Sequence, residues 1–131
     1  MEIGDVKLAA PETLHRRIQD ERVDIWAMGL LANTLLTGRS LYHGKTYVEI
    51  IDMILSQHEF PIYKLCDIGH FIAKSTRKIV SDRQKLLGIK DDPIFKDLDF
   101  AKLQARQIPS RISKNQPSRQ GSRMSSRSYA E

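Results

Sequence analysis

The sequence has few of the features that would assign it a particular chemistry. It contains one cysteine in 131 residues, which excludes an internal disulfide and a zinc site built from cysteines. We interpret this residue, Cys66, as a buried thiol in a helical stretch rather than as a nucleophile. The four histidines show none of the short spacings typical of metal ligands, so the sequence argues against a metal site.

Long hydrophobic runs are also missing. No apolar stretch approaches the ~20 residues that a membrane-spanning helix needs. The first residues lack the basic and apolar regions of a signal peptide. We therefore expect no membrane partner and a cytoplasmic protein, with the nucleus as the alternative.

Little net charge lies outside the C-terminal tail. The chain carries a net charge of +5, and residues 109–131 hold +4 of it, from five basic residues and Glu131. Few side chains of this tail are apolar, so residues 110–131 are predicted to be disordered. The tail also lacks the interleaved aromatic residues that stack on bases, which argues against an RNA-binding protein and against nucleic acid as a partner.

What the sequence does contain is helical periodicity. Residues 21–37 are apolar on almost every face, which predicts a helix that is buried all round. Apolar residues recur at helical spacing over residues 46–57 and 67–80, and residues 99–106 are predicted to add a further turn or two. No stretch alternates cleanly enough to predict a strand. The sequence therefore predicts an all-α fold.

Two of these helices have clear end signals. Gly38 is suited to end the first helix, and Thr46 with Glu49 predicts a capping box at the start of the second.

The segment Gly44-Lys45-Thr46 is similar to the end of an ATP-binding phosphate loop. That loop needs a second glycine five residues before Gly44, where Arg39 stands, and it needs a preceding strand. We interpret the segment as a turn into a capped helix.

The most specific pattern begins at Ala10-Pro11-Glu12. Asp24, Trp26 and Gly29 follow at the spacing that protein kinases show between the end of the activation segment and the central helix of the large lobe. Four further segments follow in the family's order, which are L-L-T-G at 35–38, L-Y-H-G at 41–44, S-D-R-Q-K-L-L-G at 81–88 and D-P-I-F-K-D-L-D-F at 92–100. Together they resemble the AGC group of serine/threonine protein kinases.

The resemblance implies a fold and a division of the chain. Residues 1–95 would be part of the helical C-terminal lobe of a protein-kinase-like fold, residues 96–109 the start of an AGC-type C-terminal tail, and residues 110–131 a disordered Ser/Arg-rich extension. The family structural motif would consist of Ala10, Pro11, Glu12, Asp24, Trp26 and Gly29, with Trp26 as core packing.

The motifs that perform phosphoryl transfer are not in this sequence. There is no G-x-G-x-x-G loop for the phosphates, no H-R-D-x-x-x-x-N catalytic loop and no D-F-G magnesium motif. The family uses ATP and Mg²⁺, but we expect no cofactor, no metal and no catalytic residue in this chain.

The sequence also departs from the family within the shared motifs. Asp5 and Leu8 stand where the family has a threonine and a tyrosine before A-P-E. The family pairs the A-P-E glutamate with an arginine at the position occupied here by Leu86. We therefore expect Glu12 to be more exposed than in an active kinase, unless Arg83 or Lys85 replaces that arginine.

Two functional hypotheses from different classes remain open. One is a fragment of a serine/threonine kinase, inactive by itself, whose partner is the missing N-terminal kinase segment. The other is a kinase-derived interaction module without chemistry that binds a protein partner. In both, Ser122 and Ser126 are candidate phosphoacceptors, because Arg119 and Arg123 stand three residues before them, a pattern similar to what basophilic kinases accept.

Overall fold

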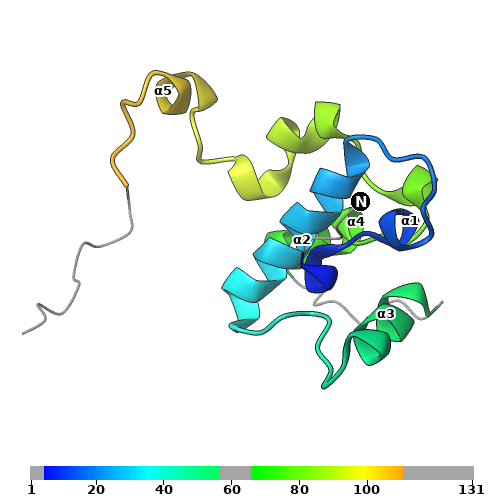
Figure 1. Ribbon diagram of the computed structural model, residues 1–131. Coiled ribbons are helices and arrows are strands. Elements are labelled where there is room, and N and C mark those ends of the chain that lie inside the picture. The colour runs from blue at the N-terminus through cyan, green and yellow to red at the C-terminus, as the bar shows by residue number, and fades with distance from the viewer. Residues whose placement is uncertain (1–4, 57–65, 111–131) are drawn as a thin grey trace, which may run out of the picture. The chain divides into compact units, whose positions relative to one another are not determined.

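A computed structural model describes residues 5–56 and 66–110 (Figure 1). The chain divides into two compact units, residues 1–98 and residues 99–131. Within the described residues all regular structure is helical, as the sequence predicts. The division into three parts proposed from the resemblance remains a prediction, since the two units are defined by contacts alone.

Among its described residues, the first unit contains four α-helices, with one 3-10 turn before them and three after them. They are α1 (Pro11–Leu14), α2 (Arg22–Thr37), α3 (Tyr47–Leu55) and α4 (Asp67–Ser75). The 3-10 turns are Val6–Leu8, Val80–Asp82, Leu86–Asp91 and Pro93–Phe95. In the second unit lies α5 (Phe100–Gln104). Its N-cap residue is Asp99, whose side chain accepts a hydrogen bond from Lys102 N.

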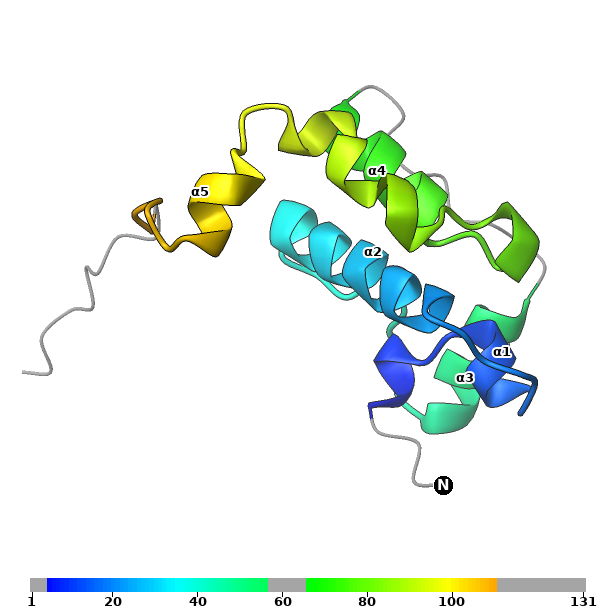
Figure 2. The same cartoon turned by 90° about the horizontal axis from the view of Figure 1, so that it is seen from above.

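Helix α2 is the centre of the first unit. Figure 2 shows it lying between α4 on one side and α1 with α3 on the other. Towards α1 and α3 it buries Trp26 and Leu30, and towards α4 it buries Ile25 against Phe71 and Ile89. Both sides of one helix therefore supply the hydrophobic core.

The contact between α2 and α4 depends on a glycine. A methyl group at Gly29 would lie 2.6 Å from Ser75 Cβ and 2.8 Å from Thr76 Cγ2. The two helices can approach this closely because Gly29 has no side chain. Gly29 thus has a packing role in the helix that carries the family motif.

The predicted ends of α2 and α3 are confirmed. Gly38 ends α2 in the left-handed conformation, with φ 72°, and its N–H bonds to Thr34 O. Thr46 and Glu49 form the capping box of α3, which ends at Leu55, two residues before the predicted end at Gln57.

Two other predictions about the helices were wrong. Helix α4 ends at Ser75, not Val80, because residues 77–83 leave the helix and return Arg83 to a buried position against α1. Cys66 is exposed at the N-cap of α4 instead of buried, since it precedes the apolar face of that helix. Outside the helix, Ile79 is 63% exposed.

Candidate functional site

A buried ion pair joins the A-P-E segment to the chain that follows α4. Arg83 donates to both carboxylate oxygens of Glu12, with Nη1–Oε1 at 2.6 Å and Nη2–Oε2 at 3.1 Å. Glu12 is 4% exposed and Arg83 2%. The expectation that Glu12 is more exposed is therefore wrong, and the exception that the sequence allowed holds. Arg83, three positions before Leu86, takes the place of the family's arginine.

Arg83 directs two further donors to backbone carbonyls. Its Nε bonds to Arg77 O at 2.9 Å, and Nη1 also bonds to Arg22 O at 2.8 Å. A buried charge is tolerated when it is paired and its hydrogen bonds are satisfied. One side chain therefore ties together α1, the start of α2 and the segment after α4.

The other motif residues separate into two groups. Ala10 is the N-cap residue of α1 and Pro11 is its first residue. Both are buried, and Ala10 belongs to the same core cluster as Trp26. The Trp26 ring stacks on Tyr42 with centroids 5.8 Å apart, which agrees with its predicted packing role. Asp24 instead is exposed in the first turn of α2, where a negative charge suits the helix dipole.

The Gly44-Lys45-Thr46 segment is the turn that the sequence predicts. The carboxylate of Glu49 accepts hydrogen bonds from Lys45 N at 2.7 Å and Thr46 N at 3.4 Å. Two backbone N–H groups just before α3, of the kind that a phosphate loop would offer to a nucleotide, are therefore bound by a side chain of that helix.

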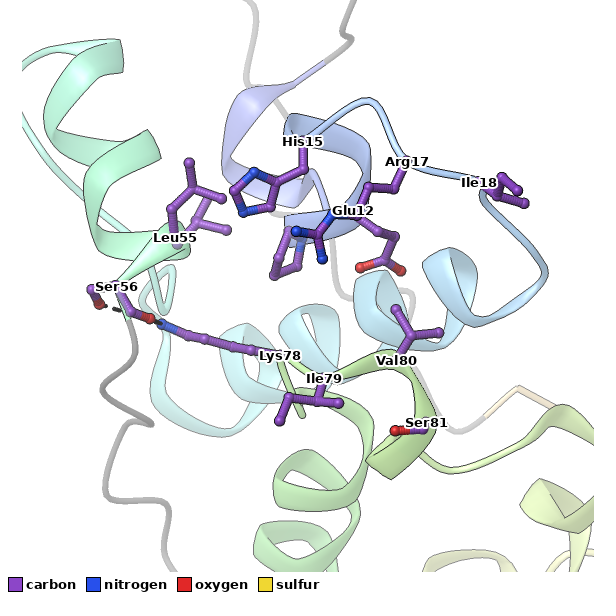
Figure 3. A pocket seen from close by; sticks show the side chains of 12 residues that line it. Glu12, His15, Arg17, Ile18, Leu55, Ser56, Lys78, Ile79, Val80 and Ser81 are labelled. Atoms are coloured by element: carbon purple, nitrogen blue, oxygen red, sulfur yellow. Dashed lines mark hydrogen bonds between the residues drawn. The ribbon is translucent and has the colours of Figure 1, made fainter.

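Next to the ion pair lies a cleft of about 710 Å³ (Figure 3). Its three walls are α1 with the loop after it, the C-terminal end of α3, and residues 78–81. Apolar side chains form much of its lining, among them Pro11, Ile54 and Val80. The volume falls within the range of about 300–1,000 Å³ typical of ligand pockets. This cleft was not predicted from the sequence, because its walls come from three separate segments.

Lysine 78 connects two walls of the cleft. Its ammonium group donates to Met53 O at 3.1 Å and to Ser56 O, at the end of α3. It also lies 5.8 Å from the centroid of the Tyr42 ring. A cation at a helix C-terminus satisfies carbonyls that have no partner within the helix. Lys78 therefore holds the end of α3 against the segment after α4.

A second charged pair lies at the start of α2. The Arg22 guanidinium bonds to the Asp20 carboxylate at 2.6 Å and to Val80 O at 3.0 Å. Hydrogen bonding from the Arg22 side chain holds the pKa of Asp20 below its usual value. The same bond raises the pKa of Arg22.

Three further expectations concern a metal site, a membrane-spanning helix and the phosphoacceptor serines. In residues 5–56 and 66–110 no three histidine, cysteine or acidic side chains cluster in a way that could hold a metal ion. No helix among these residues is long and apolar enough to cross a membrane. Ser122 and Ser126 lie outside the described residues, so their role stays a prediction.

Comparison with known proteins supports the resemblance, although no family model matches the chain. It is 27% identical over 119 residues to Protein kinase C-like 1 of Caenorhabditis elegans, covering 81% of this chain and 16% of that protein. It is 31% identical over 94 residues to Serine/threonine-protein kinase Sgk1 of Bos taurus, covering 68% of this chain and 20% of the kinase. This chain is a homologue of AGC-type serine/threonine kinases.

The similarity to AGC-type kinases covers only a part of each kinase. A probable serine/threonine-protein kinase of Dictyostelium discoideum is also similar, at 29% identity over 105 residues, covering 80% of this chain and 20% of that protein. The chain spans about a fifth of the length of the curated kinases it matches. Within that span, this AGC-kinase homologue keeps A-P-E and a glutamate–arginine pair, but places the arginine at a new position.

Proposed function

We propose that this chain forms a helical, non-catalytic part of the C-terminal lobe of a protein serine/threonine kinase. The activity of the whole protein would then be ATP-dependent protein phosphorylation. The observation that carries the proposal is that similarity to serine/threonine kinases extends over 68–81% of the chain, while the sequence contains none of the phosphate-holding or magnesium-holding motifs.

A direct test is titration of the purified chain with Mg-ATP in a calorimeter. We expect no saturable heat and no transfer of labelled phosphate to a basic peptide substrate, with an intact AGC-type kinase as the positive control. Saturable binding that excess unlabelled nucleotide competes away would overturn the proposal that this chain lacks the nucleotide site.

The alternative function is a kinase-derived interaction module that acts without chemistry. It is favoured by the exposed apolar face of α2, where Leu31 and Leu35 are 57% and 76% exposed. The two functions predict different sizes for the protein that is present in cells. Immunoprecipitation followed by intact-mass measurement should recover a species much larger than 15.0 kDa if the chain is part of a kinase. A species of that mass alone would favour the module.

A further inference from the structure

The cleft beside the Glu12–Arg83 pair has walls that the chain holds in place. The ion pair fixes α1 to the segment that contains residues 78–81, and Lys78 fixes that segment to the end of α3. Each of the three walls is therefore bonded to another by a charged side chain. A cleft held in this way does not have to be ordered when a ligand binds, which favours affinity.

Exposed apolar side chains stand at two edges of the cleft. Ile18, in the loop after α1, is 98% exposed, and Ile79, on the opposite wall, is 63% exposed. Figure 3 shows these two side chains on different walls. Single exposed apolar residues are common, but two that border an apolar cleft extend its surface and are typical of an interaction site. The surface suits a ligand with at least one large apolar group.

The ionisable side chains that line the cleft are mainly basic. They are His15, Arg17, Lys78 and Glu12, and the charge of Glu12 is already matched by Arg83. The exposed guanidinium of Arg17 makes no ion pair with any carboxylate among the described residues. In Figure 3 it reaches from the loop after α1 towards His15, beside the cleft. A ligand that carries negative charge would therefore find a complementary group on this wall.

We propose that this cleft binds an acidic peptide segment of a partner protein, with a bulky apolar side chain in the cleft and a carboxylate on Arg17. The C-terminal tail of this chain does not fit the description, because residues 109–131 carry a charge of +4. The inference stands on the geometry and charge of the cleft. It holds whether the chain is part of a kinase or an interaction module.

The test uses the full chain and three fluorescein-labelled hexapeptides. The acidic apolar peptide EELFEE should bind saturably in fluorescence anisotropy. The peptide KKLFKK, with the charges reversed, and the peptide EEGSEE, without the apolar pair, should bind at least about tenfold more weakly. Raising the salt concentration should weaken binding of EELFEE, since part of the attraction is between exposed charges.

Two charge-reversal variants identify the binding surface. Arg17→Glu should weaken binding of EELFEE about tenfold or more. Arg39→Glu changes the net charge by the same amount at an exposed residue outside the cleft, and should leave binding unchanged. Far-ultraviolet circular dichroism should be the same for both variants. Equal effects of the two variants would mean that the peptide responds only to net charge, and would overturn the proposal.

A photo-crosslinking experiment tests whether the peptide binds to the apolar surface of α2 instead of to the cleft. EELFEE with photo-leucine at its leucine should label residues of the cleft walls, as mapped by mass spectrometry of proteolytic fragments. Labelling confined to residues 28–36 of α2 would overturn the proposal even if anisotropy showed binding.

Discussion

The guanidinium of Arg83 lies over the ring of Trp26, with 5.1 Å between Arg83 Cζ and the ring centroid. The same guanidinium binds Glu12 in a two-point ion pair. Cation–π contacts at desolvated sites contribute about 2 kcal/mol, and both residues are buried here. Arg83 therefore connects the A-P-E segment with the central helix both by charge and by stacking.

Replacement of this arginine should be costly. We expect Arg83→Met to lower the free energy of unfolding by about 3–5 kcal/mol, because the Glu12 carboxylate stays buried without its partner. The measurement is urea unfolding followed by Trp26 fluorescence. It is made in a background with Leu31→Gln and Leu35→Gln, which we expect to reduce self-association through the exposed side of α2.

A double variant separates the charge from the packing. Glu12→Gln combined with Arg83→Met should recover part of the loss, since no unpaired carboxylate remains buried. Arg39→Met is the matched control at an exposed arginine and should change the free energy of unfolding by less than about 0.5 kcal/mol. A loss in Arg83→Met no larger than in the control would refute the role of the pair.

The exposed side of α2 should make the isolated chain self-associate or lose fixed packing. Its exposed apolar residues are Met28, Leu31, Leu35 and Leu36. Burial of one such side chain contributes roughly 1.5–3 kcal/mol, so several uncovered ones are large compared with the typical margin of ~5–15 kcal/mol.

Sedimentation measurements test this expectation. The unmodified chain should form oligomers or aggregates, and the Leu31→Gln, Leu35→Gln variant should shift the distribution towards monomer. A matched substitution at exposed Leu87, outside α2, should leave the distribution unchanged. A monomeric unmodified chain with a sharp melting transition would contradict the expectation.

The close contact at Gly29 predicts a sensitivity to one methyl group. Gly29→Ala places a Cβ against Ser75 and Thr76 at distances below 3.0 Å, and overpacking of this kind costs about 1–3 kcal/mol. A gain of helix propensity of about 1 kcal/mol opposes that cost. We expect net destabilisation in thermal melts followed by circular dichroism. Gly88→Ala, where a Cβ would meet nothing within 4 Å, should be nearly neutral, and equal melting of the two variants would rule out the steric argument.

Ser122 and Ser126 should accept phosphate from a basophilic kinase. Each phosphate adds about −1.5 to −2 charge, so two would cancel most of the +4 of the tail. Labelled ATP followed by peptide mapping gives the sites. Arg119→Ala should remove label from Ser122 alone and Arg123→Ala from Ser126 alone. Label on neither serine of the unmodified chain means that the prediction fails.

Local signals in the sequence predicted local structure well. The capping box of Thr46 and Glu49 and the left-handed Gly38 each depend on residues within one turn of a helix end. The length of α4 was overestimated, because helical periodicity continues past Ser75. After the helix the chain carries Arg83 to a buried bond with Glu12, 71 positions away in the sequence, and a pattern with a period of 3.6 residues carries no signal for such a pair.

The candidate cleft could not be predicted from local sequence patterns either, because its walls come from three separate segments of the chain. Its walls include three residues of the motifs, Pro11, Glu12 and Ser81, and also Lys78, which lies five residues before Arg83. The sequence had already indicated Arg83 as a possible partner of Glu12, whereas none of the motifs includes Lys78. The apolar contribution of α3 to the cleft depends on how the helices pack, which no local pattern encodes.

The positions of Trp26 and Cys66 allow a distance within this chain to be followed by fluorescence energy transfer. Each is the single residue of its type in the sequence. The indole is fully buried beside Arg83, while the thiol is exposed at the beginning of α4. A maleimide acceptor dye would therefore attach at one site, and energy transfer from the one indole donor would report the separation of two points on α2 and α4. Folding, peptide binding and self-association can thus be followed on the native sequence without a substitution.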